Sequence, residues 1–193
     1  EAHIYANFLA DSSLKYPFVC LLVSGGHTQL WHVKKMNHYI LLGETRDDAA
    51  GEAFDKGARI FGLGYPGGPA IEQAAKGGNP CTYSFPRGLM NDDSLEFSFS
   101  GLKTSLLYFM DDYRESQTMK IQDVIASYQE AIVESLVEKM RRAIHITKTD
   151  TGVIAGGVAA NERLRECLSE SLPNIRILFP DLTYCTDNAA MVG

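Results

Sequence analysis

The sequence has few cysteines, and their spacing excludes two kinds of site. Cys20, Cys81, Cys167 and Cys185 are widely separated, and no CxxC pair occurs. A zinc ribbon and a thioredoxin-type redox motif both depend on such closely spaced pairs. We therefore expect reduced thiols, as in cytosolic proteins.

Long apolar runs and the features of a secretion signal are also missing. No run of 18 apolar residues is present to span a bilayer. The amino-terminal segment EAHIYANFLADSS lacks the basic, apolar and small-residue zones of a signal peptide. We expect a soluble intracellular protein. Because the chain starts at Glu1 and stops at Gly193, early in an expected helix, we also expect it to be a fragment.

Positive charge is in short supply. The 18 Lys and Arg residues are outnumbered by 24 Asp and Glu residues, which gives a formal net charge of -6. Phosphate contacts need clustered cations, so a surface that grips nucleic acid unaided is not expected. A polyanionic partner would need a local patch or a helper protein. The rest of the composition, 45% hydrophobic and 22% charged over 193 residues, is that of one globular domain or two small ones.

The hydrophobic pattern predicts an α/β domain, because strands come first and then alternate with helices. Predicted strands cover residues 17–23, 29–33 and 39–42 as a meander, then 97–100, 152–155 and 175–179. Predicted helices cover 47–60, 69–78, 103–110 and 120–147, and another follows Asn161, a good N-cap. Segment 79–95 is polar and turn-rich, which indicates a surface excursion.

Two glycine turns are candidates for nucleotide binding. LVSGGHTQL, residues 22–30, has bare backbone at a strand-to-strand turn, which suits a phosphate, although an ordinary Gly-Gly hairpin explains it equally simply. AGGVAAN, residues 155–161, leads into a helix whose N-terminus is able to hold a nucleotide or is only a helix start. Neither turn has GxGxxG or GxxxxGK[ST] spacing. Together they predict a cleft that clamps one nucleotide from both walls.

Acidic residues and histidines supply further candidates. Asp55 and the Gly67-Gly68 turn are placed to meet around the hydroxyls of a sugar. The other nearby acids, Asp47, Asp48 and Glu52, are better explained as an acidic first helical turn. His3 and Asp187 have donor types that suit a transition metal, but a surface histidine and a helix cap account for them as well.

The order of six motifs resembles the threonylcarbamoyl-adenosine synthase family, also known as TsaD, YgjD or Gcp and formerly as O-sialoglycoprotein endopeptidase. The motifs are LVSGGHTQL, DDAAGEAFDK, GLGYPGGP, FSFSGLKT, AGGVAANERLR and CTDNAAM. The second and fourth are similar to the bacterial and mitochondrial branch. The resemblance implies an α/β, actin-like ATPase fold of the sugar-kinase, Hsp70 and ribonuclease H type. It also implies that residues 1–193 are mostly the second lobe, without the amino-terminal phosphate-loop lobe and the last carboxy-terminal helix.

The resemblance also implies roles for individual residues. His3, which ends a partial HxExH motif, and Asp187 would be ligands of one divalent metal ion per subunit, iron or zinc. The substrate would be threonylcarbamoyl-AMP or an adenine nucleotide. Its expected contacts are Leu22, Val23, Ser24, Gly25 and Gly26 on the phosphate side, Asn161 on the adenosine side, and Asp55, Gly68, Gly156 and Gly157 as further contacts. No residue is an evident general base.

The implied activity is transfer of the threonylcarbamoyl group to the exocyclic amine of the adenosine 3′ of the anticodon, in tRNAs reading codons that begin with A. Implied partners are tRNA, a TsaB-like paralogue and a TsaE-like ATPase, with a homodimer or heterodimer, no membrane, and a cytoplasmic or, in a eukaryote, mitochondrial location. We expect the 193-residue piece alone to bind metal weakly and not to turn over.

Two other classes stay open. A zinc metalloendopeptidase is what the older family name asserts, but the HExxH pattern is absent from these residues. A sugar kinase or a non-catalytic nucleotide-binding module of the same fold would bind ATP without needing His3 or Asp187.

Overall fold

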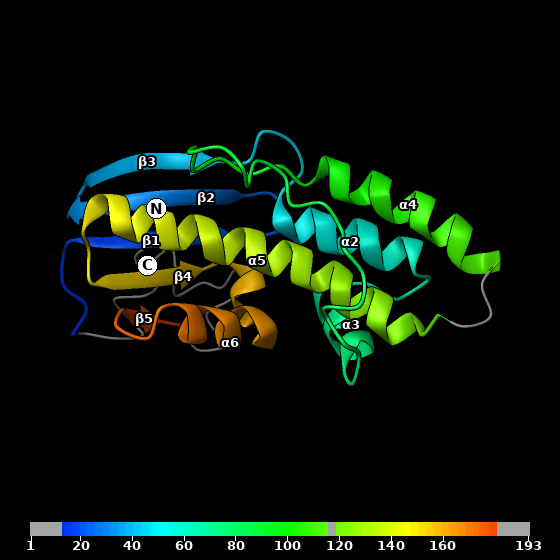
Figure 1. Ribbon diagram of the computed structural model, residues 1–193. Helices are drawn as coiled ribbons and strands as arrows, with labels where there is room; N and C mark the ends of the chain where they lie inside the picture. Colours follow the sequence, from blue (N-terminus) through cyan, green and yellow to red (C-terminus); the bar gives the residue numbers. More distant parts are fainter. Residues whose placement is uncertain (1–12, 116–118, 181–193) are drawn as a thin grey trace.

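A five-stranded sheet forms the centre of the computed structural model, which describes residues 13–115 and 119–180. The strand order is β3-β2-β1-β4-β5 (Figure 1). The strands are β1 Phe18–Val23, β2 Thr28–Lys35, β3 His38–Glu44, β4 Thr151–Ala155 and β5 Arg176–Leu178. β1, β2 and β3 pair antiparallel, which confirms the predicted meander, and β4 and β5 continue the sheet in parallel with β1.

β1 is the middle strand, and every one of its residues is buried. Its side chains alternate between two apolar clusters, one on each face of the sheet, as a continuous apolar run predicts. The parallel pairing places Leu22 opposite Ala155. The carboxyl ends of β1 and β4 therefore lie side by side, and the two glycine turns leave the sheet at the same edge.

One long helix packs along the sheet and joins it to the smaller helices (Figure 1). This helix, α5, runs over Ile121–Thr147, close to the predicted 120–147. The others are α2 Ala50–Ile60, α3 Gly67–Ala75, α4 Ser100–Glu115, the short η1 Gly157–Ala160 and α6 Glu162–Ser171. Tyr128 of α5 is fully buried, and its hydroxyl donates a 2.8 Å hydrogen bond to the carbonyl of Ala53 in α2. Among the described helices, none has the length and apolarity needed to cross a membrane.

Asp47 does not begin a helix, contrary to the prediction for residues 47–60. α2 starts at Ala50, whose N–H donates to the hydroxyl of Thr28 at 2.8 Å. The carboxylate of Asp47 instead accepts hydrogen bonds from the N–H groups of Phe99 and Ser100, at 2.7 and 3.2 Å, at the start of α4. Only Glu52 lies in the first turn of α2. The acid therefore stabilises the start of a helix about 50 residues later in the chain, which periodicity cannot reveal.

Three further boundaries differ from the predictions. α3 begins at Gly67 rather than at Pro69, and α4 covers 100–115 rather than 103–110. The predicted strand 97–100 is reduced to a single bridge between Thr45 and Phe97. Short elements such as these depend on tertiary contacts more than on their own sequence.

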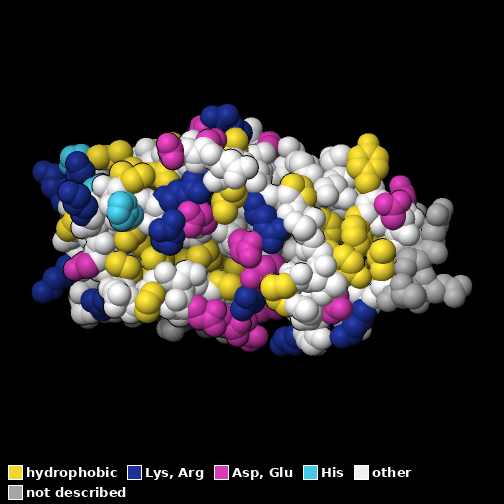
Figure 2. All heavy atoms as spheres, viewed as in Figure 1, with side chains coloured by type: hydrophobic (Ala, Val, Ile, Leu, Met, Phe, Trp, Pro, Cys, Tyr) yellow, Lys and Arg dark blue, Asp and Glu magenta, His cyan; other side chains and the backbone are white. Residues whose placement is uncertain are grey.

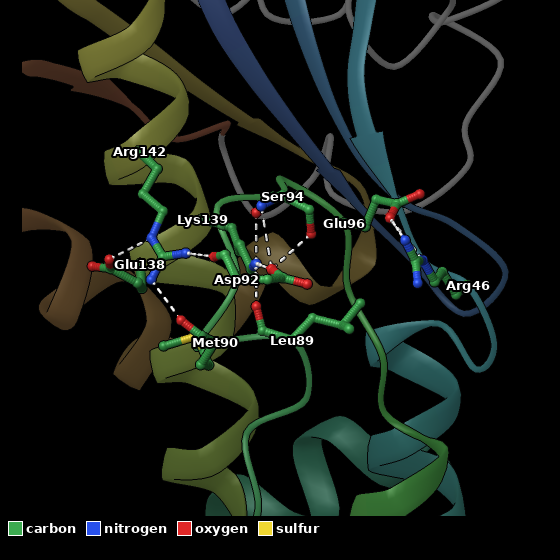
Figure 3. Close-up of polar contacts among 9 residues, drawn as sticks. All are labelled: Arg46, Leu89, Met90, Asp92, Ser94, Glu96, Glu138, Lys139 and Arg142. Carbon is green, nitrogen blue, oxygen red and sulfur yellow. Dashed lines mark hydrogen bonds and ion pairs between the residues drawn. The ribbon is translucent and has the colours of Figure 1, made fainter.

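The polar excursion 79–95 is fixed to α5 by buried cations (Figure 3). Lys139 has no solvent-exposed surface, and its Nζ donates to the carbonyls of Leu89 and Ser94 and, at 3.2 Å, to Asp92. Arg142 donates to the carbonyls of Met90 and Asp92 at 2.8 and 2.6 Å. A segment without helix or strand thus has its backbone groups satisfied by side chains of the longest helix.

Candidate substrate pocket

The two glycine turns, which the sequence predicts to face one cleft, meet at the carboxyl ends of β1 and β4. Gly156 has φ +92°, and a Cβ built there would lie 2.3 Å from the carbonyl oxygen of Val23 and 3.4 Å from Cβ of Ser24. No side chain fits at such a separation, so glycine is required on both conformational and steric grounds. We call the turns Ser24–His27 and Gly156–Gly157, with the pocket beside them, the glycine-turn end.

The first turn is closed by its own hydrogen bonds. The N–H of Ser24 donates to the carbonyl of His27 at 2.8 Å, and the N–H of His27 donates to the Ser24 hydroxyl at 3.1 Å. The start of α2 lies directly against this turn, since the N–H of Gly51 donates to the Ser24 carbonyl at 3.2 Å. A Cβ on Gly51 would come within 2.8 Å of the Gly25 backbone. The turn and the positive end of a helix dipole are therefore held together, an arrangement that favours an anion.

A pocket of about 250 Å³ opens between this turn, α2, α3 and η1. Five of the residues predicted to touch substrate line it: Gly25, Asp55, Gly68, Gly157 and Asn161. Its other walls are largely apolar, formed by residues such as Phe54, Pro66, Pro69 and Val158. Apolar walls with a few polar groups are typical of small-molecule sites.

The other predicted contacts lie behind or beside the pocket. Leu22 and Val23 are buried in β1 and belong to the clusters on opposite faces of the sheet. Ser24 and Gly156 are the first residues of the two turns and pack against each other outside the pocket lining, and Gly26 is exposed next to Gly25.

Asp55 joins α2 to the start of α3. Its Oδ1 accepts a 2.8 Å hydrogen bond from the N–H of Gly67. A Cβ on Gly67 would lie only 2.5 Å from Cα of Asp55, so this approach also depends on bare backbone. One carboxylate oxygen therefore positions α3, while the side chain as a whole lines the pocket. An acceptor in this position is suited to a sugar hydroxyl, as the sequence predicts.

Asn161 is the N-cap of α6, which confirms that part of the prediction. Its Oδ1 accepts from the N–H of Leu164 at 2.9 Å, and its Nδ2 donates to Gln129 at 3.1 Å. The N–H of Glu162 is also bound, by the carboxylate of Glu72 at 2.8 Å. Two of the first donors of α6 are therefore already used within the protein. The helix N-terminus nearer to the first glycine turn belongs to α2 instead.

Sequence reasoning missed two residues of the pocket, Tyr65 and Glu72. The side chain of Tyr65 is 86% exposed at the pocket wall. Burial raises the pKa of Glu72, although its hydrogen bond from Glu162 acts in the opposite direction. Glu72 follows Gly68 by one helical turn of α3, and this spacing is the signal that could have placed Glu72 at the pocket.

The predicted metal ligands, His3 and Asp187, lie outside the described residues. Within residues 13–115 and 119–180, no group of three or more His, Cys, Asp or Glu side chains is arranged to hold a metal ion. The metal site therefore stays a prediction from the sequence.

Comparison with known proteins identifies the family. The family model for TsaD, described as tRNA N6-adenosine threonylcarbamoyltransferase, matches residues 1–193. The chain belongs to the TsaD family. It is 53% identical over 193 residues to the tRNA N6-adenosine threonylcarbamoyltransferase of Kosmotoga olearia, and 52% identical over 196 residues to that of Desulfitobacterium hafniense. These alignments cover 99% and 100% of this chain but 57% and 58% of the relatives.

Solved structures confirm the fold that the family resemblance implied. The chain is similar to the activator of the 2-hydroxyisocaproyl-CoA dehydratase from Clostridium difficile with bound ADPNP, with a TM-score of 0.55 and 14% identity, over 95% of this chain and 61% of the other. It is also similar to component A of the (R)-2-hydroxyglutaryl-CoA dehydratase of Acidaminococcus fermentans, with a TM-score of 0.53 and 16% identity, over 99% and 62%. Both are actin-like ATPase-fold proteins, so this TsaD-family chain has that α/β fold.

Proposed function

We propose that the protein transfers the threonylcarbamoyl group from threonylcarbamoyl-AMP to the exocyclic amine of the adenosine 3′ of the tRNA anticodon, in tRNAs reading codons that begin with A. The pocket at the glycine-turn end carries this proposal, because residues from four separate segments of the sequence converge there in a chain that matches the TsaD family throughout. The relatives from K. olearia and D. hafniense are named tRNA N6-adenosine threonylcarbamoyltransferases, which supports the same reaction class.

Each wall of the pocket suits one part of an adenylate. The exposed backbone of Gly25 and Gly26, beside the N-terminus of α2, suits the phosphate. Asp55 is an acceptor for ribose hydroxyls, and the apolar walls around Phe54 and Val158 suit the flat base. The nucleotide analogue bound in the C. difficile activator supports a nucleotide in this fold.

The reaction is an acyl transfer in which AMP departs. The attacking amine forms a bond to the carbamoyl carbon while the bond from that carbon to the phosphate oxygen breaks. Backbone N–H groups at the first turn would stabilise the charge that develops on the departing phosphate, because they are already oriented before the substrate binds. We identify no general base among the described residues.

One divalent metal ion, iron or zinc, belongs to the proposal on the basis of the sequence alone. The imidazole of His3 and the carboxylate of Asp187 are donor types that such metals accept. When bound, the metal would polarise the carbamoyl carbonyl or orient the phosphate. The family resemblance adds a TsaB-like paralogue, a TsaE-like ATPase, a homodimer or heterodimer and a cytoplasmic or mitochondrial location to the same proposal.

The experiment measures adenylate binding and tRNA modification in a full-length protein that contains this sequence. Asp55→Asn removes the charge but keeps an oxygen for the Gly67 N–H, so adenylate affinity should fall about tenfold with the fold intact. Asp93→Asn, at an exposed position outside the pocket, is the matched control. Asp187→Ala should abolish transfer and leave folding unchanged.

Four results would decide against the proposal. Transfer retained by Asp187→Ala, or equal adenylate affinity in the two Asn variants, contradicts the assigned roles. ATP-dependent phosphorylation of a sugar, or chelator-sensitive cleavage of a glycoprotein, would favour the kinase or peptidase class instead.

A further inference from the structure

Positive side chains gather at the end of the sheet opposite to the glycine-turn end. Figure 2 shows them at the left of the molecule, where Figure 1 places the amino end of β1 and the carboxyl end of α5. Four segments make up this region: 13–17 before β1, 34–39 at the β2–β3 hairpin, 145–151 after α5, and 173–176 before β5. We call it the basic end, and its exposed cations are Lys15, Lys34, Lys35, Lys148 and Arg176, with His38 and His145 beside them.

The charge of this region contrasts with that of the whole chain. The four segments hold five Lys and Arg residues and one carboxylate, Asp150, in a chain of net charge -6. Many arginines and lysines elsewhere are paired with carboxylates, for example Arg163 with Glu130 at 2.8 Å and Lys56 with Asp48 at 2.6 Å. The four lysines of the basic end form no ion pair within the part of the chain that the structure describes. Their charge is therefore directed at the solvent.

A neighbouring histidine is subject to this positive field. The pKa of His32 is lowered, first by burial and then by the positive charges of Lys34 and His38. The same charges that disfavour a protonated imidazole would favour a bound anion.

Two hollows with cationic walls lie side by side at this end. One, of about 520 Å³, is lined by residues that include Arg141, His145 and Lys148. The other, of about 690 Å³, is lined by Lys15 and Arg176 among others, and the two share Asn174. Because both are lined by Asn174, the two hollows are neighbours, and we refer to them together as the groove. Asp150 is the one carboxylate in their lining, and cations in both hollows suit a chain of phosphates better than a single ion.

We propose that the basic end binds the phosphate backbone of the substrate RNA at a distance from the reacting nucleoside. This inference rests on the proposed function. β1 has six residues, so the basic end lies about 20 Å from the glycine-turn end at roughly 3.3 Å per residue. A nucleoside in the loop of an RNA hairpin is separated from the phosphates of its stem by a comparable length. The stem would contact the basic end while the loop reaches the pocket.

Lysines on solvent-facing segments fit this role. Contacts between lysine and phosphate release counterions and carry no sequence information, so they strengthen binding to every tRNA that the enzyme accepts. They would give an acidic protein the local patch that it needs for a polyanion.

The test compares two triple variants of the full-length protein in binding a fluorescent anticodon stem-loop RNA over a series of salt concentrations. Lys15→Gln/Lys34→Gln/Lys148→Gln removes three charges from the basic end. Arg59→Gln/Lys103→Gln/Lys120→Gln removes three from α2, α4 and the start of α5. In the first variant we expect at least tenfold weaker binding and a salt slope that is smaller by about 2 to 3, since each phosphate contact contributes about 0.7 to 0.9. The RNA affinity of the second variant should stay within about twofold of that of the parent, because its three cations lie outside the basic end.

Binding of AMP, the part of the adenylate held by the pocket, is measured on the same samples and should be equal in all three proteins. If both triple variants lose RNA affinity equally, or neither does, while the parent binds AMP and modifies tRNA, the basic end is not the RNA surface and the proposed function stands. If the parent binds neither AMP nor the stem-loop, the proposed function is wrong, and this inference, which depends on it, is wrong as well.

Discussion

At the carboxyl ends of β1 and β4 the chain is packed so closely that several positions have no room for a Cβ, whereas at the opposite end of the same sheet long side chains extend into solvent. The glycine-turn end obtains its geometry from backbone contacts such as those of Gly51, Gly67 and Gly156. The basic end has exposed lysines and an arginine on four separate segments and one carboxylate, Asp150, among them. Substitutions at the first region should therefore change folding and small-ligand binding, and those at the second should change long-range electrostatic attraction.

The largest effect is expected from Gly156→Ala at the glycine-turn end. The new Cβ would lie 2.3 Å from the Val23 carbonyl oxygen on a backbone with φ +92°, so the unfolding free energy should fall by about 3 kcal/mol or more. Gly62→Ala is the matched control, because Gly62 has φ +72° and nothing within 4 Å. It should lose only about 1 kcal/mol in the same urea titration. If both variants lose the same unfolding free energy, the positive φ alone, without close packing, accounts for the glycine at position 156.

A smaller effect is expected from Glu138→Gln, which changes both stability and the charge next to the basic end. Hydrogen bonds from Arg141 and then Arg142 lower the pKa of Glu138 to about 2, against the opposing effect of burial. Because the folded value lies below the ordinary value of 4.5, the carboxylate stabilises the fold above about pH 4.5, and this stabilisation is lost as the pH falls toward 2. The variant should be less stable than the parent by about 1 kcal/mol at pH 7 and equal to it near pH 2.

The same substitution leaves Arg141 without its carboxylate partner at the wall of the groove. Binding of the stem-loop RNA should then become about two- to threefold tighter, since the salt slope gains up to about one phosphate contact. Glu170→Gln, an exposed acid on α6, is the control. A stability difference that persists at pH 2 would show that Glu138 acts through packing and not through its charge.

The smallest effect is expected from Lys148→Gly. This variant tests whether the positive charge at position 148 is present although the backbone conformation there is unfavourable for lysine. Lys148 ends α5 with φ 54°, a left-handed conformation that glycine adopts without strain. The variant should gain about 0.5 to 1 kcal/mol in unfolding free energy while its RNA affinity falls about threefold. Lys148→Ala keeps the strain and loses the charge, so it should show only the second change. A loss of stability in the glycine variant would contradict this account.

Several elements were predictable because local pattern and tertiary structure agree. The apolar run of β1 and the three- and four-residue spacing along α5 place both elements within a few residues of the observed bounds. Asn161 was recognisable as a cap because its residue type and its position before an amphipathic helix both point to one. Convergence of the two glycine turns was predicted from their suitability for one nucleotide, and the parallel pairing of β1 with β4 is the structural reason for it.

Other features depend on partners far away in the chain. Asp47 caps α4 rather than α2, and Glu72 reaches the first turn of α6. Lys139 is charged, yet it is completely buried, because carbonyl groups of segment 79–95 accept hydrogen bonds from its Nζ. In each case the residue type alone does not indicate the role, which depends on a hydrogen-bond partner that is distant in the sequence.

The sequence by itself determined the family, the fold class and the residues with bare backbone, because long ordered motifs and hydrophobic periodicity are properties of the chain alone. Only the tertiary structure decided which of those residues line one pocket and which lie behind it. It also decided that lysines and an arginine from four separated segments share one end of the sheet. Both depend on strand pairing and on packing between distant segments, and neither leaves a local signal in the sequence.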